Sequence, residues 1–291
     1  MEFLDRMKEL EFESWLDLAL KSQKANLKEL KAIQEDVKLE FRDYLRLVSE
    51  RENKPRESNF IEQREMLIDF YERPPVRLKE VLKARRSEHG LLECPFCGYP
   101  YEPDTLDHFF PKEYWPEFSL HPNNLIPQCR YCMPIKGKKY YCDINKTAKY
   151  LHPIFSPLLS QIKFEITVSI VANKFTFEFC LRKPKNLNKD TFESILHHLR
   201  SLNVLKRLRL YCNKEIKKLI NLRTAYNYDI SNSLRVRLNE RGEENIGRDW
   251  KTALYSGILD SKEVIDFFNS IRPKNTNNNI EKEDEKVDFA L

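Results

Sequence analysis

Two Cys-x-x-Cys pairs constrain this chain more than any other feature of its sequence. Cys94 and Cys97 form the first pair, and Cys129 and Cys132 form the second. Each pair directs two thiolates toward one point, and four thiolates suit structural zinc. Such a site has no open coordination position, so we expect the metal to hold the loops together rather than to catalyse. Four unrelated buried cysteines are a poorer explanation because the two spacings match.

Composition excludes several classes of protein. A hydrophobic content of 41% in 291 residues supports two or three packed units, and the net charge of +5 is too small to diagnose nucleic-acid binding. The charged N-terminus indicates no secretory signal, and no apolar run is long enough to span a membrane. Phosphate-binding glycine loops are absent. We therefore predict a cytoplasmic protein with reduced thiols, and the remaining cysteines, Cys142, Cys180 and Cys212, are predicted to be buried.

The hydrophobic pattern predicts an α+β fold in four parts. Residues 1–88 form a helical N-terminal region, because apolar residues recur every three or four positions between Leu30 and Val48. Residues 89–150 hold the cysteine pairs, residues 151–271 form a hairpin with helices, and residues 272–291 have the composition of a disordered tail. Residues 49–59 are predicted to be a linker, and 60–71 and 76–86 to be helices.

The C-terminal part combines a hairpin with basic helices. Residues 162–170 and 175–181 alternate between apolar and polar side chains, which predicts a β-hairpin with one buried face. Asn188 is positioned to cap the helix that follows. From His197 to Arg223, taken as one helix, the chain carries eight basic residues and one acid. This segment is either a track for a phosphate backbone or an ordinary solvated face.

Between the cysteine pairs lies an acid–histidine dipeptide, Asp107-His108, within an apolar segment that predicts a short strand. Adjacent strand residues point to opposite faces, so one can hold a cation while the other addresses water. Histidine is a suitable general base near neutral pH. A lone histidine is usually structural, but its position between the two cysteine pairs favours a functional interpretation.

Residues 91–139 resemble an HNH, or ββα-metal, endonuclease with cysteine pairs around its active site. The family pattern is close to C-x-x-C, then D-H-x-x-P, then N-L, then C-x-x-C-N-x-x-K-G. The resemblance rests on the four cysteines and on the following residues: Asp107, His108, Pro111, Asn124, Leu125, Lys136 and Gly137.

The resemblance implies a mechanism of DNA hydrolysis. His108 would be the general base, and Asp107 would bind a catalytic Mg²⁺ or Mn²⁺ beside the structural Zn²⁺. Asn124 would tie the loop so that His108 is held in orientation. Lys136 and Lys138 would contact a phosphate.

One position departs from the family pattern. Met133 stands where the family places an Asn or His as the second metal ligand, and a thioether is a poor ligand for Mg²⁺. Pro134 follows, which predicts a helix capped by position 133. The cation would then be held by Asp107 with water and phosphate, or by a neighbour such as His121 or Asp143. The alternative is weak or absent cleavage.

The wider motif set resembles HNH subunits of prokaryotic anti-phage systems, such as Septu and some retrons. The resemblance implies a separate ATPase as partner, and the sequence makes no prediction of oligomeric state. The rival interpretation is a catalytically silent zinc module that binds nucleic acid or acts as a scaffold for a partner.

Overall fold

The structure is a computed structural model that describes residues 1–273. It contains helices and small antiparallel sheets, which confirms the predicted α+β class. The α-helices are α1 (Ser14–Leu20), α2 (Leu27–Ser49), α3 (Arg64–Glu72), α4 (Val76–Ser87), α5 (Met133–Lys136), α6 (Lys189–Ser201), α7 (Val204–Ala225), α8 (Ile230–Asn239), α9 (Trp250–Leu259) and α10 (Lys262–Ser270). The strands are β1 (Thr105–His108), β2 (Leu125–Gln128), β3 (Tyr141–Cys142), β4 (Thr147–Ala148), β5 (Lys163–Val171) and β6 (Lys174–Arg182). The predicted tail lies outside the described residues, apart from Arg272 and Pro273.

The N-terminal region is helical, although less completely than its pattern predicts. In α2 the apolar stripe turns inward and buries Leu30, Val37, Phe41, Tyr44 and Val48. The prediction of continuous helix was wrong before Ser14, where the chain forms only a short 3-10 turn. Residues 50–63 link α2 to α3 without an α-helix, so α3 begins later than predicted.

The central segment is built on a short antiparallel hairpin. Thr105 pairs with Gln128 at one end of β1 and β2, and His108 pairs with Leu125 at the other. The first cysteine pair precedes β1 and the second follows β2, so the hairpin brings the two pairs to the same end. Met133 is the first residue of α5 and Cys132 is its N-cap, so the prediction of a cap at 133 was wrong by one residue.

The C-terminal part forms around the long hairpin of β5 and β6, which confirms the predicted hairpin and turns at Ala172 and Asn173. Asn188 caps α6 by accepting a hydrogen bond from the main-chain N–H of Thr191 at 2.8 Å. The predicted basic helix is broken at Asn203, whose φ of 51° separates α6 from α7. Helix α9 packs on β5 at Gly257, where an added Cβ would lie 1.8 Å from the carbonyl oxygen of Ile166.

Of the three other cysteines, which were predicted to be buried, one agrees with that prediction and two differ from it. Cys212 is buried, but Cys142 is half-buried and Cys180 is exposed. Cys180 occupies an outward position of β6, so strand alternation outweighs the general tendency of cysteine to be buried.

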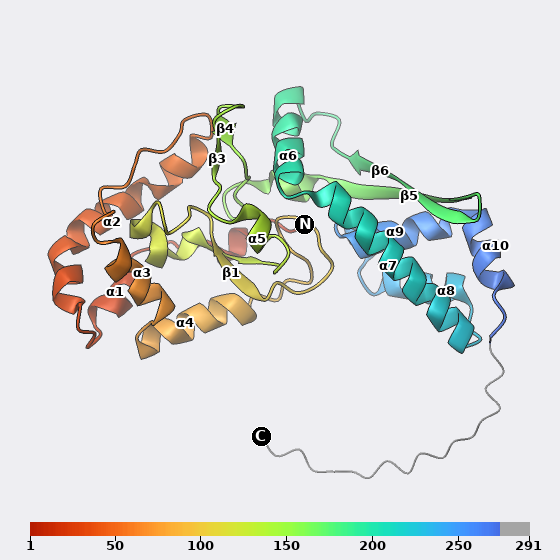
Figure 1. Cartoon of the computed structure of the whole chain (residues 1–291), viewed down its shortest axis with the longest axis horizontal. Coiled ribbons are helices and arrows are strands. Elements are labelled where there is room, and N and C mark those ends of the chain that lie inside the picture. Colours follow the sequence, from red (N-terminus) through yellow and green to blue (C-terminus); the bar gives the residue numbers. More distant parts are fainter. Residues whose placement is uncertain (274–291) are drawn as a thin grey trace, which may run out of the picture.

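Figure 1 shows the central hairpin and α5 between the N-terminal helices on one side and α6–α10 on the other. His198 joins the central and C-terminal parts, because Nε2 lies 2.7 Å from the carbonyl oxygen of Phe96 and Nδ1 accepts the N–H of Leu151 at 2.9 Å. The main-chain N–H of Trp250 also donates to Gly98 at 3.1 Å. The predicted domain boundaries stay predictions. In residues 1–273 no helix combines the length and hydropathy that crossing a membrane requires.

Candidate active site and metal centre

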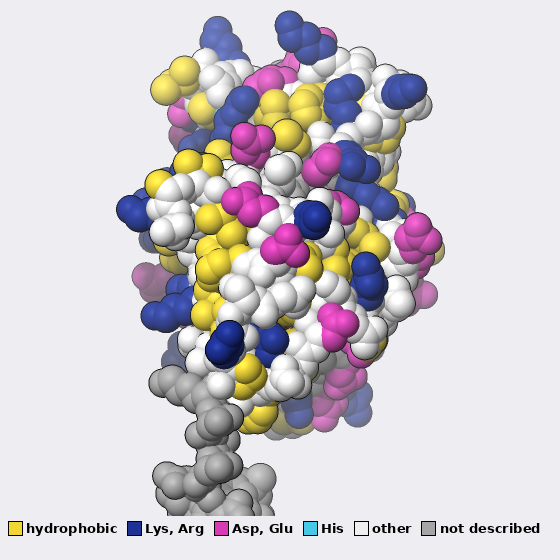
Figure 2. Space-filling view, turned by 90° about the vertical axis from the view of Figure 1, so that its right-hand side faces the viewer, with side chains coloured by type: hydrophobic (Ala, Val, Ile, Leu, Met, Phe, Trp, Pro, Cys, Tyr) yellow, Lys and Arg dark blue, Asp and Glu magenta, His cyan; other side chains and the backbone are white. Residues whose placement is uncertain are grey.

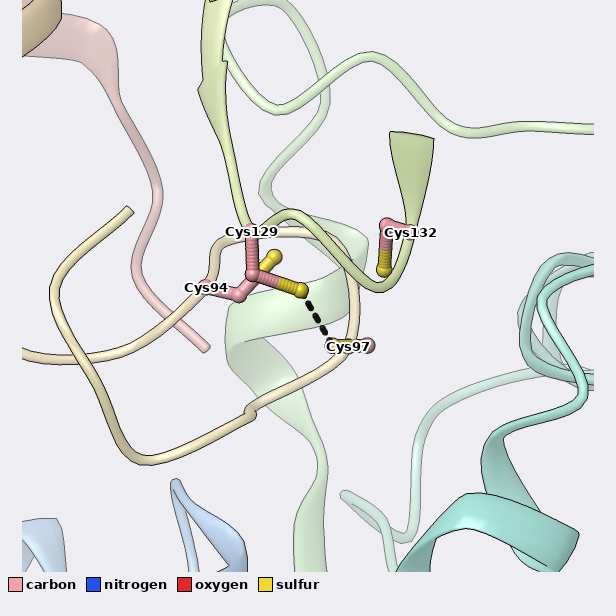
Figure 3. Close-up of side chains that lie close together, drawn as sticks. All are labelled: Cys94, Cys97, Cys129 and Cys132. Carbon is pink, nitrogen blue, oxygen red and sulfur yellow. Dashed lines mark hydrogen bonds between the residues drawn. The ribbon is translucent and has the colours of Figure 1, made fainter. Parts of the chain in front are cut away.

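The four predicted cysteines come together at the end of the β1–β2 hairpin (Figure 3). All four are buried, and their sulfur atoms lie within 4.8 Å of one another. Sγ of Cys97 and Sγ of Cys129 are 3.8 Å apart. A tetrahedral site with Zn–S bonds of about 2.3 Å has edges of about 3.8 Å. The donor set therefore fits a metal such as zinc, and the ligand prediction for this cluster is supported by its geometry.

Arg207 of α7 lies against this cluster, although the sequence pattern placed it in the solvent-facing basic segment. Its guanidinium donates to Sγ of Cys132 at 3.2 Å, of Cys97 at 3.5 Å and of Cys129 at 3.6 Å. The charge offsets part of the negative charge of the thiolates. Hydrogen bonds from the neighbouring thiols, with a smaller contribution from the Arg207 charge, hold the pKa of Cys129 well below its usual range, although burial alone would raise it. Arg207 also stacks on Trp250, with its Cζ 5.4 Å from the ring centroid.

The other basic residues of α7 divide between the surface and the interior. Arg223 is buried and donates to the side-chain oxygen of Asn227 at 3.0 Å. The exposed ones are Lys206, Arg209, Lys214, Lys217 and Lys218. Figure 2 shows the α10 end of the molecule, where acidic and basic side chains are interspersed. That face carries no continuous basic patch.

At the other end of the hairpin, β1 presents the predicted dipeptide. His108 is buried, and its Nε2 lies 3.2 Å from the carbonyl oxygen of Ser119. The ring of Tyr71 packs edge-on against it, with centroids 4.4 Å apart. Burial lowers the pKa of His108 to about 3, so the imidazole is neutral at physiological pH. A neutral ring that donates from Nε2 carries an unprotonated Nδ1, which is the atom that can accept a proton from water.

Asn124 is fully buried beside this dipeptide. Its side-chain oxygen accepts the N–H of Phe110 at 2.7 Å and the hydroxyl of Tyr44 at 3.0 Å. Its amide group donates to the carbonyl oxygens of Phe110 at 3.1 Å and Phe118 at 3.0 Å. These bonds join the segment after β1 to the turn that supplies Ser119. The contacts are those that a residue orienting His108 would make.

Asp107 forms an ion pair with Lys136. Nζ of Lys136 lies 2.7 Å from Oδ2 of Asp107 and donates to the carbonyl oxygen of His108 at 2.7 Å. Burial raises the pKa of Asp107, and Lys136 opposes that rise. The resemblance implied that Lys136 contacts a phosphate. Its side chain is 0% exposed, however, so a phosphate backbone cannot reach it. Lys138 is exposed, with Glu113 3.8 Å away.

The expected second ligands for a catalytic cation do not gather around Asp107. Met133 is 43% exposed at the start of α5. His121 is buried and stacks on Tyr44 with centroids 4.1 Å apart, while Asp143 faces solvent 3.4 Å from Lys54. Within residues 1–273, the four cysteines are the one group of three or more histidine, cysteine or acidic side chains placed to share an ion. The side chains present therefore do not fit a tightly held Mg²⁺.

Sequence reasoning missed several residues around His108. Tyr71 and Ser119 reach it from α3 and from the turn before β2, and no local pattern marks either position. Lys112 also acts on it, since its charge helps to lower the pKa of His108. Lys112 follows the Asp-His-Phe-Phe-Pro segment directly, and that position was the available signal.

Comparison with known proteins gives two distant relatives. Protein ea31 of Escherichia phage lambda is 27% identical over 195 residues, which cover 62% of this chain and 64% of that protein. Septu protein PtuB of Bacillus thuringiensis is 27% identical over 171 residues, which cover 55% of this chain and 58% of that protein. The chain thus spans less than two thirds of the length of either relative. No family model and no solved structure matches it. A distant similarity to a Septu protein agrees with the group that the motifs resemble.

Proposed function

We propose that this protein is a nuclease of the HNH type that hydrolyses phosphodiester bonds in DNA as part of an anti-phage defence complex. The observation that carries the proposal is the placement of a neutral, oriented histidine on a strand next to Asp107, in a hairpin framed by four cysteines. The similarity to a Septu protein supports the biological setting.

His108 is the general base of the proposed reaction. The carbonyl oxygen of Ser119 holds Nε2, so Nδ1 takes the proton from the attacking water. A pKa of about 3 is low for a base that works near neutral pH. A bound phosphate places negative charge near the ring and raises this pKa, which improves the base when substrate is present. Asn124 is a positioning residue, because it acts on the loop around His108.

Two metals belong to the proposal. The cysteine cluster holds structural Zn²⁺, which keeps β1, β2 and α5 together. A divalent Mg²⁺ or Mn²⁺ requirement follows from the resemblance, and such an ion would stabilise charge on the phosphate. The site residues offer one acidic side chain to it, Asp107, so no step is assigned to this ion here.

Phosphate contacts come from two lysines near the hairpin, of which Lys138 is exposed and Lys112 is half-buried. Lys138 follows α5 and is open to solvent. Lys112 stands near His108, where its Nζ lies 3.0 Å from a carboxylate oxygen of Glu72. Both lie on the central segment, so they can hold a DNA backbone close to the dipeptide. Contacts of this kind carry no sequence information.

A plasmid-nicking assay with zinc-loaded protein and Mg²⁺ or Mn²⁺ tests the proposal. His108→Ala should lower the rate by about 10²- to 10⁴-fold, the usual contribution of a general base. His197→Ala is the matched control, because His197 is a partly exposed histidine on α6 outside the hairpin. Nicking that survives His108→Ala at the full rate would show that the assigned base is wrong.

A catalytically silent zinc module is the second candidate, and the pairing of Asp107 with Lys136 favours it. Such a module would bind DNA or a separate ATPase, the partner class that the resemblance implies, without cutting. DNA binding by wild-type protein with no nicking under any metal condition would select this candidate. Equal nicking of RNA would change the substrate class instead.

A further inference from the structure

Lys136 is the most unusual charged residue near the candidate active site, because its side chain is completely buried. Two of its contacts are short: Oδ2 of Asp107 and the carbonyl oxygen of His108, each at 2.7 Å. Its Nζ also lies 5.8 Å from the ring centroid of Tyr150. The ammonium therefore has a carboxylate, a carbonyl and an aromatic ring around it.

A buried ammonium requires a counter-charge, because it has lost its hydration. Among the described residues, Asp107 is the one acid within ion-pair distance of Lys136. The resemblance implies that the Asp107 carboxylate binds a divalent ion, but this carboxylate is already paired with a cation of the chain itself. A divalent ion bound to the same carboxylate would stand beside the ammonium, and like charges in a buried site repel strongly.

The neighbours of Asp107 lead to the same conclusion. Mg²⁺ and Mn²⁺ are held by several oxygen ligands. Met133 supplies a thioether at the protein surface. Within residues 1–273, neither His121 nor Asp143 belongs to a group of side chains around Asp107 that is placed to share an ion. These side chains thus depart from the family pattern in two ways: the Asp107 carboxylate is already paired, and the second metal ligand is missing.

We infer that Lys136 is the resident cation of this site and that Asp107 is its structural counter-ion, so the free protein binds no divalent ion tightly at Asp107. A divalent ion needed for cleavage would then have to arrive with the DNA phosphate. The inference deepens the proposed function, since it states what the Asp107–His108 dipeptide requires.

Lys136 also acts as a positioning residue for His108. It ends α5, which begins directly after Cys132, and it bonds to the main chain of His108 itself. The cysteine cluster is thereby connected to the proposed base through one short helix and one side chain. Loss of Lys136 should loosen the strand as well as expose Asp107.

Mn²⁺ titration followed by electron paramagnetic resonance tests the inference on the full, zinc-loaded chain without DNA. Mn²⁺ competes poorly with zinc for thiolates, so the cysteine cluster does not interfere. Wild-type protein should bind Mn²⁺ with a dissociation constant above about 1 mM, weaker than dedicated protein sites for divalent ions. Tight binding that Asp107→Asn removes would overturn the inference.

Substitution of the lysine gives the second arm. Lys136→Met removes the charge at similar length and should strengthen Mn²⁺ binding by at least about tenfold, because Asp107 loses its counter-ion. Lys136→Met with Asp107→Asn should abolish the gain, and Lys138→Met is the matched control on an exposed lysine of the same segment. Unchanged Mn²⁺ binding in folded Lys136→Met would contradict the inference.

Should Lys136→Met fail to fold, the comparison of wild type with Asp107→Asn still decides, since Asn keeps an acceptor for Lys136. A protein that never nicks DNA would contradict the proposed function and leave the Mn²⁺ result unaffected.

Discussion

The two ends of the β1–β2 hairpin are built on different principles. At the Thr105–Gln128 end, four sulfur atoms point to one centre and Arg207 stands outside them. At the His108–Leu125 end, one carboxylate is already paired with an ammonium, beside a neutral imidazole. The first end offers a complete ligand set, whereas the second offers an oriented base. Under the proposed function, one short hairpin carries a structural metal at one end and the general base at the other, without sharing ligands between them.

Disrupting the cysteine end should have the largest effect. Zinc contributes about 10–16 kcal/mol of apparent folding free energy in small zinc modules, and the four sulfurs here come from the segment before β1 and from the turn between β2 and α5. We expect Cys129→Ser to lose stoichiometric zinc and to lower Tm by more than about 20 °C. Elemental analysis and thermal unfolding followed by circular dichroism would measure both.

Cys180→Ser is the control for that experiment, because Cys180 is exposed on β6 and belongs to no ligand cluster. A Cys129→Ser protein that keeps its zinc and its Tm would show that the cluster is not a metal site.

Acidification should have the next largest effect, because it acts on buried histidines near the dipeptide and beyond it. Burial lowers the pKa of His108, His121 and His198 to about 3, and that of His152 well below its usual value. Below pH 6.5 the unfolded chain therefore binds protons that the native chain does not, so stability falls as pH falls. Burial raises the pKa of Glu117 to about 7, so near pH 6 the native chain binds a proton there that the unfolded chain does not. This proton offsets one of the four that the unfolded chain gains at the histidines. About three net protons correspond to about 4 kcal/mol per pH unit.

Urea unfolding at pH 7.5, 6.5 and 5.5, with retained zinc measured at each pH, would test this dependence. His121→Phe should remove about one proton from the slope, since His121 stacks on Tyr44 as a phenyl ring could. His197→Gln should change the slope less than His121→Phe does, because His197 is partly exposed, although burial also lowers its pKa. A stability that stays constant from pH 7.5 to 5.5 would contradict the neutral, buried state of these histidines.

The two ends of the hairpin also differ in how well sequence predicts them. The cysteine end was predictable because each Cys-x-x-Cys pair is local, and β1 followed from a short apolar segment. The α2 stripe, the β5–β6 hairpin and the Asn188 cap were predictable for the same reason. Each of these signals lies within a few residues of the structure that it specifies.

Side-chain partners across long separations were not predictable. Lys136 looked like one of several surface lysines, and its burial depends on Asp107 lying opposite it in the folded hairpin. Arg207 lies 75 residues from Cys132 in the chain, and no local pattern indicates that its guanidinium contacts the cysteines. The break at Asn203 depends on a left-handed backbone that asparagine tolerates but does not require.

Substitution of Arg207 should have an intermediate effect on the cysteine end of the hairpin. Hydrogen bonds from an outer residue to metal ligands change affinity by about 10- to 100-fold. We expect Arg207→Met to weaken zinc binding by that factor in a chelator competition assay, and Arg207→Lys to recover part of the loss. Lys206→Met, on the neighbouring exposed residue, should have no effect. Zinc affinity equal to wild type in Arg207→Met would show that the guanidinium contacts are incidental.

Met133→Asn should have the smallest effect, and it compares the two explanations of the departure from the family pattern. Met133 is 43% exposed at the first turn of α5, so the change should alter stability by less than about 0.5 kcal/mol. Because Lys136 already matches the charge of Asp107, we expect no gain in Mn²⁺ affinity or nicking rate from Met133→Asn alone. In the double variant with Lys136→Met, the introduced Asn should then contribute to Mn²⁺ affinity. A sharp rise in nicking with the single substitution would instead identify the thioether, not the ammonium, as the group that limits this end of the hairpin.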